Sequence, residues 1–204
     1  MATLILDRNL ERHFHESRLS TPSSERDEVW DGVTIFMPLR NLEHQRIVAF
    51  FMRVFHHIYE LDGPVLCLPG ANVSDRIQGW DKNYREPDVL VVFEDSQAKE
   101  CDTHLCGGPD FLVEVLSPDD RSREKLPFYA KIGSREVLLI DRDPWQLELY
   151  QLKRGKLRLV GTAKPGDETT LTSVVLPLSF ELLGGKSRPK IRIRHTESDR
   201  AWTL

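Results

Sequence analysis

Apolar residues follow two patterns along the chain, and each pattern predicts a different element. Between residues 41 and 61 they recur at the 3.6-residue spacing of a helix, at Ile47, Phe51, Val54, Phe55 and Ile58. Elsewhere they form short, nearly continuous runs, which predict strands: "VLCLP" (65–69), "PDVLVVF" (87–93), "DFLVEVL" (110–116) and "REVLLID" (135–141). Runs that do not alternate are typical of strands covered on both faces.

Turn signals and polar spacing complete the expected elements. Asp31-Gly32 separates two short β-prone pieces and predicts a hairpin. "QLELYQL" (146–152) and "KLRLVG" (156–161) flank a turn and predict a second hairpin. A shorter helix is expected over about 122–132, closed by Gly133. The order of helix, strands, second helix and strands predicts an α/β fold around a mixed sheet.

The 204 residues fit one domain with extra segments at both ends. We expect a loosely ordered leader over 1–27 and a folded domain over 28–183. Residues 184–204 begin with "GGKSRPKIRIRH", in which basic residues alternate with others. As a strand this segment would be a basic ribbon, and as coil a basic arm that contacts phosphate or an acidic partner. A solvated tail without a partner is the alternative.

Composition narrows the classes of function. The net charge of −4 argues against a large electrostatic footprint on DNA but leaves room for a local nucleic-acid site. Apolar runs stay far below the ~18 residues of a membrane span, and the start of the chain has no secretory pattern. We therefore expect a cytoplasmic protein that does not enter a membrane. The odd number of cysteines, three, does not predict a disulfide framework.

The segment "CDTHLC" (101–106) offers a possible zinc site through Cys101, His104 and Cys106. A structural zinc ion requires four ligands at a different spacing. A polar loop with two free thiols is the simpler interpretation.

Glu114 is the unexpected residue, because it interrupts the most apolar segment of the chain. A buried carboxylate must be protonated, pair with a cation or bind a metal ion. Asp88 stands just inside another buried strand, so two carboxylates could meet, and a divalent cation would relieve their repulsion. Mg²⁺ takes one or two carboxylates and leaves positions for water and phosphate. Alternatively, Asp88 only opens its strand after Pro87, and Glu114 pairs with an arginine.

A family resemblance supports the metal interpretation. Residues 28 to about 183 resemble the Uma-type restriction endonuclease family of the PD-(D/E)XK nuclease superfamily. The resemblance lies in "EVWDGVTIFMP", "HQRIV", "EPDVLVV", "GGPDFLVEVLSP", "REKLPFYAKIGSREVLLID" and "LELYQL", in this order. It implies a restriction-endonuclease-like core, in which a long N-terminal helix and a shorter second helix flank a mixed β-sheet with added hairpins.

The resemblance also implies roles for particular residues. Asp88 and Glu114 match the metal-binding acids, and the Val115 carbonyl is a possible third ligand. The implied ion is Mg²⁺, with Mn²⁺ as a substitute. The family pattern further points to Glu28, before the first hairpin, and to His44 at the start of the long helix, beside Gln45. For His44, a packed and hydrogen-bonded core residue is the alternative interpretation.

The catalytic lysine is displaced from its usual place. Two residues after Glu114 stands Leu116 instead of lysine. The family resemblance points to Lys125 in the following helix, although a solvated helix lysine is the alternative. Pro127 is tolerated only in the first turn of a helix. We therefore expect the regular helix to start near 124–126, or to be kinked there.

Two main functions remain open from the sequence, and a phosphodiesterase-like enzyme acting on another substrate is a third, weaker option. The first is a Mg²⁺-dependent endonuclease that hydrolyses DNA phosphodiester bonds, by resemblance as a homodimer with one site for each strand. The second is a non-catalytic nucleic-acid-binding or scaffold protein that keeps the nuclease fold. The displaced lysine, Pro127 and the acidic net charge favour the second.

Overall fold

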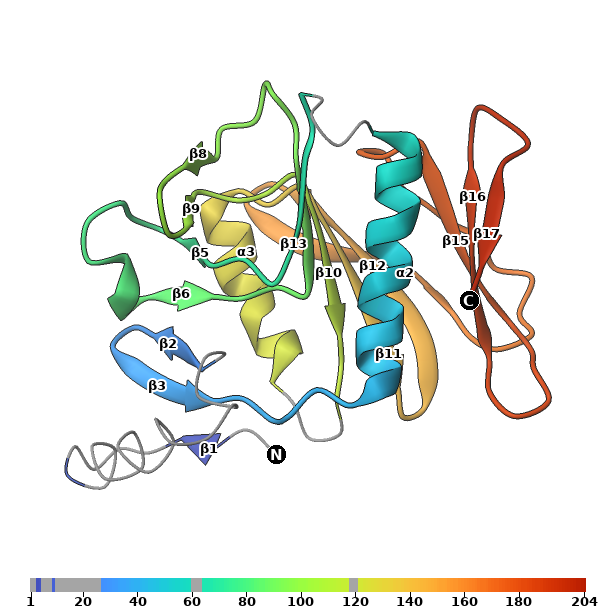
Figure 1. Cartoon of the computed structure of the whole chain (residues 1–204), viewed down its shortest axis with the longest axis horizontal. Helices are drawn as coiled ribbons and strands as arrows, with labels where there is room; N and C mark the ends of the chain where they lie inside the picture. The colour runs from blue at the N-terminus through green and yellow to red at the C-terminus, as the bar shows by residue number, and fades with distance from the viewer. Residues whose placement is uncertain (1–2, 5–8, 10–26, 60–63, 118–120) are drawn as a thin grey trace.

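A six-stranded mixed sheet forms the centre of the protein (Figure 1). The computed structural model describes residues 3–4, 9, 27–59, 64–117 and 121–204. The strands of this sheet lie in the order β13 (Lys156–Ala163), β12 (Trp145–Lys153), β11 (Glu136–Arg142), β10 (Phe111–Val115), β7 (Val89–Val92) and β4 (Leu66–Pro69). Strand β10 pairs parallel with β11 and antiparallel with β7. The four buried runs and the second hairpin are thereby confirmed.

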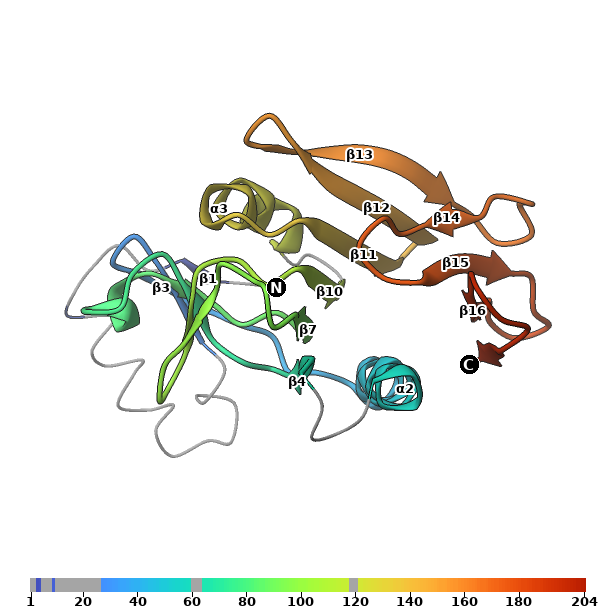
Figure 2. The same cartoon turned by 90° about the horizontal axis from the view of Figure 1, so that it is seen from above.

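Helices cover the two faces of this sheet, as the continuous apolar runs predicted (Figure 2). Successive residues of β10 alternate between two cores. Phe111 and Val113 pack with α2 (Leu42–Ile58) in one cluster. Leu112 packs with Phe128 of α3 (Leu126–Ile132) in the other. The α/β fold class predicted from the sequence is confirmed.

Helix α2 begins where the sequence indicated. The side chain of Asn41 accepts a hydrogen bond from the backbone nitrogen of His44 at 2.9 Å, which caps the first turn. The predicted apolar stripe is buried along its length. The helix ends at Ile58, slightly before the predicted end, and residues 60–63 lie outside the described part.

The second helix has an irregular start, which Pro127 explains. A 3₁₀ turn, η3 (Ser122–Lys125), leads into the α-helix, and Pro127 occupies its first turn. There its missing N–H would have no intrahelical partner in any case. Gly133 caps the end with a φ of 93°. The expected start near residues 124–126 is confirmed.

A second sheet consists of short strands. Their order is β1 (Thr3–Leu4), β3 (Val33–Phe36), β2 (Glu28–Trp30), β6 (Tyr84–Arg85), β5 (Val73–Ser74), β9 (Leu105–Cys106) and β8 (Lys99–Glu100). The predicted first hairpin is β2–β3, with Asp31 and Gly32 at positive φ (49° and 85°). No element was expected at β5, β6, β8, β9 or the 3₁₀ turn η2 (Trp80–Lys82), because such short elements carry no periodic signal.

The basic C-terminal segment belongs to a third sheet. Its order is β14 (Leu171–Thr172), β15 (Leu178–Leu183), β16 (Lys190–His195) and β17 (Ala201–Thr203). Ile191 and Ile193 of β16 are buried in the core on the α2 side. Arg192 and Arg194 point away from it and pair with Glu181. Of the two forms considered for this segment, the structure has the strand, so these residues are not a solvated tail.

Most of the leader over 1–27 lies outside the described residues. Among the helices that are described, none combines the length and the hydropathy needed to cross a bilayer.

Candidate active site

The strand register brings Asp88 and Glu114 together. Strands β7 and β10 pair Val91 with Phe111, Leu90 with Leu112 and Val89 with Val113. One step further, this register sets Asp88 opposite Glu114. Directly opposed residues of an antiparallel pair point to the same side. Both residues are 2% exposed, so two acids converge in the protein interior.

Asp88 is held by donors on both of its oxygens. Arg40 Nη2 lies 2.7 Å from Oδ1, and His44 Nε2 lies 2.9 Å from the same atom. The Val115 backbone N–H donates to Oδ2 at 2.7 Å. Burial alone would raise the pKa of Asp88, but the His44 hydrogen bond and the charge of Arg40 hold it below its ordinary value. Asp88 is therefore ionised at neutral pH.

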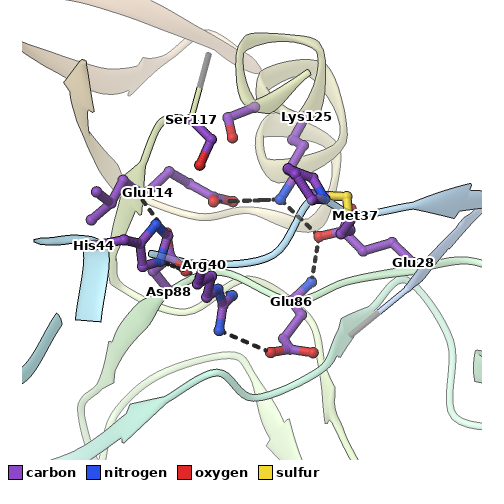
Figure 3. A pocket seen from close by; sticks show the side chains of 12 residues that line it. Glu28, Met37, Arg40, His44, Glu86, Asp88, Glu114, Ser117 and Lys125 are labelled. Atoms are coloured by element: carbon purple, nitrogen blue, oxygen red, sulfur yellow. Dashed lines mark hydrogen bonds and ion pairs between the residues drawn. The ribbon is translucent and has the colours of Figure 1, made fainter. Parts of the chain in front are cut away.

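Glu114 is held by side chains of η3 and α3. Lys125 Nζ lies 3.1 Å from Glu114 Oε1 and 3.4 Å from Oε2. The Tyr129 hydroxyl donates to Oε1 as well. The same Lys125 ammonium donates to Glu28 Oε1 at 2.7 Å, so it bridges two carboxylates (Figure 3).

The lysine comes from the 3₁₀ turn η3 and not from the strand. Leu116, two residues after Glu114, is a buried member of the core on the α3 side. Lys125 is 1% exposed and lies in the last position of η3, directly before α3. Its ammonium reaches Glu114 from there, so the alternative of a solvated lysine does not apply. The irregular turn before Pro127 therefore directs Lys125 inward.

Around these groups lies a small cavity of about 30 Å³ (Figure 3). This volume exceeds the ~10–15 Å³ that a cavity needs to hold one water molecule. The residues that line it come from both hairpin and helix segments: Glu28, Met37, Pro38, Arg40, His44, Glu86, Asp88, Glu114, Val115, Ser117, Ser122 and Lys125. All the residues selected from the sequence, namely Glu28, His44, Asp88, Glu114, Val115 and Lys125, meet at this cavity.

The cavity holds more acids than fixed cations. Glu28, Glu86, Asp88 and Glu114 line it, against Arg40 and Lys125. Burial raises the pKa of Glu114 to about 8, and the charges of Asp88 and Glu28 add to the effect. Burial likewise raises the pKa of Glu86 to about 7. Burial would lower the pKa of Lys125, but Glu114 and Glu28 outweigh it and keep the ammonium charged.

This donor set suits a divalent cation that keeps part of its water shell. Among the described residues, no three His, Cys, Asp or Glu side chains form a complete metal cage. Mg²⁺ does not need one, because it uses one or two carboxylates. A bound divalent cation would also favour the ionised form of Glu114, whose pKa burial raises to about 8. Glu114 Oε2 has only the long contact to Lys125 and is the most available ligand atom.

Comparison with known proteins places the chain in a family. Residues 12–183 match the family model "Uma2: Putative restriction endonuclease". The match covers well over half of the chain. The protein belongs to the Uma2 family. The resemblance inferred from the sequence is thereby confirmed.

A solved structure supports the fold of this Uma2 protein. It is a crystal structure from Anabaena variabilis, described as a putative nuclease belonging to DUF820. The two chains are 19% identical with a TM-score of 0.53, and the match covers 71% of this chain and 82% of that chain. At this identity the likeness shows the fold alone. No curated protein matches the sequence.

Three residues that bond the acids of this candidate site, Tyr129, Glu86 and Arg40, were not selected from the sequence. Tyr129 follows Lys125 by four residues, the spacing that brings side chains together on a helix, so its position could have indicated it. Glu86 stands directly before Pro87 in "EPDVLVV", beside the acid that was selected. Arg40 precedes the cap of α2 and carries no signal in the sequence.

His44 shows features of both interpretations made from the sequence. It is buried in α2 and packed, as the alternative stated. Its Nε2 nevertheless contacts the Asp88 carboxylate, and its Nδ1 is buried without a hydrogen-bond partner in the described structure. His44 therefore orients Asp88 from the side of α2.

The possible zinc ligands are engaged elsewhere. His104 stacks on Trp80, with ring centroids 4.9 Å apart. Its Nε2 contacts the Arg76 carbonyl at 3.1 Å, and its Nδ1 contacts the Thr103 hydroxyl. Both ring nitrogens are thus in use. Cys101 and Cys106 are free thiols in the β8–β9 hairpin region.

Proposed function

We propose that this Uma2 protein is a Mg²⁺-dependent endonuclease that hydrolyses phosphodiester bonds of DNA, with Mn²⁺ as a substitute ion. The proposal rests on one observation. Asp88, Glu114 and Lys125 reach a single buried cavity from neighbouring strands and a helix start. Membership of a restriction endonuclease family supports the reaction class.

In this proposal Asp88, Glu114 and the Val115 carbonyl hold the metal ion. When bound, the ion would lower the pKa of a water molecule and stabilise charge on the phosphate. The side chains of the protein have distinct roles in the proposed reaction. His44 keeps Asp88 in place through the 2.9 Å contact to its Oδ1. The contacts to Asp88 and Glu114 leave the two carboxylates fixed before a substrate arrives.

Lys125 acts as a charged hydrogen-bond donor in this mechanism and not as a base. Its pKa is raised because Glu114 and Glu28 surround it, so it keeps its proton at neutral pH. A fixed ammonium beside the reacting phosphate can orient water and stabilise developing negative charge. Glu28 acts through Lys125, because its 2.7 Å contact fixes the direction of the ammonium.

Plasmid cleavage tests the proposal. Wild-type protein with Mg²⁺ or Mn²⁺ should nick supercoiled plasmid, and EDTA should stop the reaction. Glu114→Gln should lower the rate at least about 100-fold, as expected for loss of a catalytic carboxylate. Glu136→Gln is the matched control, since Glu136 is also fully buried but bonds Gln151, Ser173 and Val174 away from the cavity. Equal nicking by both variants, or no nicking by the wild type, contradicts the proposal.

A non-catalytic nucleic-acid-binding or scaffold role is the second candidate. One observation favours it: protein donors already occupy both acids, with Arg40 and His44 on Asp88 and Lys125 and Tyr129 on Glu114. Calorimetry separates the candidates. The nuclease should bind Mn²⁺ stoichiometrically, and Asp88→Asn should abolish that binding. If the wild type and Asp88→Asn bind DNA equally well without a divalent ion, the protein is the scaffold.

We further propose that two copies act together, one on each DNA strand. Strand β13 forms an outer edge of the central sheet, and Leu159 and Val160 on it are 53% and 47% exposed. An open edge strand is a template for pairing with another chain. Light scattering of the Glu114→Gln variant on duplex DNA should give the mass of two chains. A single chain on each duplex contradicts pairing.

A further inference from the structure

Arg40 is the one cation of the cavity that no part of the proposed reaction uses. It stands directly before the N-cap of α2, and its side chain is 16% exposed. Nη2 lies 2.7 Å from Asp88 Oδ1, and Nη1 lies 3.5 Å from Glu86 Oε1. Its positive charge therefore sits on the carboxylate to which the proposed metal ion would bind.

Asp88 does not depend on Arg40 alone. His44 Nε2 contacts the same Oδ1, and the Val115 N–H holds Oδ2. If the guanidinium left, two donors would still fix the carboxylate in place. By contrast, a divalent cation and a guanidinium on one carboxylate oxygen repel each other at short range.

Arg40 also has space into which it can move. It lines the cavity of about 30 Å³ and, on its other side, a groove of about 320 Å³. Asp88 borders both spaces. The rest of the groove comes from α2 and the end of β4: Gln45, Val48, Ala49, Met52, Pro69 and Gly70. Among the described residues that line this groove, Asp88 is the only acid, so a guanidinium in the groove is available to an anion.

We propose that Arg40 is an exchangeable counter-ion. It neutralises Asp88 in the metal-free protein, leaves it when a divalent cation binds, and then binds a DNA phosphate at the groove. The inference rests on the proposed function. A planar guanidinium fits both partners, because carboxylate and phosphate each accept two parallel hydrogen bonds from it. The Asp88 carboxylate thereby has a cationic partner before and after metal binding.

The proposal predicts effects of opposite sign on two ligands. Arg40→Gln should bind Mn²⁺ about tenfold more tightly or better in calorimetry without DNA. One neighbouring charge changes the proton affinity of a carboxylate by about 10- to 1000-fold, and tenfold is the low end of this range. The same variant should bind duplex DNA about tenfold more weakly in Ca²⁺, measured by fluorescence anisotropy.

Two further variants complete the experiment. Arg53→Gln is the matched control, because Arg53 is an exposed arginine of α2 over the Phe50 ring and lines neither space. It should leave both affinities within about twofold of wild type. Arg40→Lys keeps the charge but loses the planar fork. It should keep the wild-type Mn²⁺ affinity and lose DNA affinity.

Each outcome decides the proposal. If Arg40→Gln weakens Mn²⁺ binding, or changes neither affinity, the exchange is wrong and Arg40 has a structural role. If that variant does not fold, Arg40→Lys decides: undiminished DNA affinity overturns the proposal. If the wild type binds Mn²⁺ and Arg40→Gln binds it no better, only this inference fails. If the wild type binds no divalent cation, the proposed function fails together with it.

Discussion

Replacing Lys125 with methionine tests the electrostatics of the site without any assay of activity. The side chain is 1% exposed, and its ammonium contacts Glu28 at 2.7 Å and Glu114 at 3.1 Å. Methionine keeps most of the volume but leaves two buried carboxylates without their cation. Removing one partner of a buried ion pair costs about 3–5 kcal/mol. A domain of ordinary stability has about 5–15 kcal/mol in total, so Lys125→Met should remain folded but be strongly weakened.

The loss should depend on pH with a definite sign. The pKa of Glu114 is already raised to about 8 by burial, and removal of Lys125 raises it further. A carboxyl whose pKa in the folded protein exceeds its unfolded value binds its proton more tightly when folded. Folding therefore loses stability as pH rises from about 4.3, the unfolded value, towards the folded one. In the wild type this loss ends near the Glu114 pKa of about 8, whereas in Lys125→Met it continues to higher pH, so the deficit of the variant should be larger at pH 8.5 than at pH 6.

Urea unfolding, followed by tryptophan fluorescence at both pH values, measures this deficit. Lys131→Met is the matched control on the same helix. Its ammonium also contacts a carboxylate at 2.7 Å, that of Asp75, but the Lys131 side chain is 62% exposed. An exposed pair contributes about 0–1 kcal/mol. Equal losses in the two variants, or a loss for Lys125→Met that does not change with pH, would refute the reasoning.

Three further predictions concern other parts of the molecule. Burial raises the pKa of Glu86 to about 7, and Glu86→Gln removes this carboxyl. In thermal unfolding, the free energy of unfolding of the variant should exceed that of wild type by at most about 3 kcal/mol at pH 8.5 and by little at pH 5. Phe180→Ala should cost about 3–5 kcal/mol in urea unfolding, because the fully buried ring stacks on two other aromatic rings of the core. Gly108→Ala should prevent normal accumulation of folded protein, because the added Cβ would lie 2.2 Å from the Ser134 backbone nitrogen. Gly184→Ala is the control, since Gly184 has open space around it, and this variant should melt at the wild-type temperature.

The main elements were predictable because their signals are local. Strands β7 and β10 are covered on both faces, so nearly every residue in them is apolar. Helix α2 carries a regular stripe and its own cap at Asn41. Glu114 was noticeable because it contradicts its surroundings. The element types and the two acids could therefore be inferred from single segments.

Other features depend on contacts distant in sequence. Lys125 was selected by family resemblance, because nothing local shows that its ammonium reaches residues 97 and 11 positions away. Arg40 meets Asp88 only after α2 docks on the sheet. The alternating "KIRIRH" segment showed its basic side plainly, but its isoleucines could be assigned to the core only once Phe180 and α2 were placed.

The third sheet has a practical consequence for anyone who trims this protein. The family match stops at residue 183, which is the last residue of β15. That strand hydrogen-bonds on one side to β16 and on the other to β14. A gene fragment designed to the homology boundary would delete β16 and β17, expose the flank of β15 and uncover apolar surface over α2. Expression work should therefore retain residues 184–204, although the family match ends at residue 183.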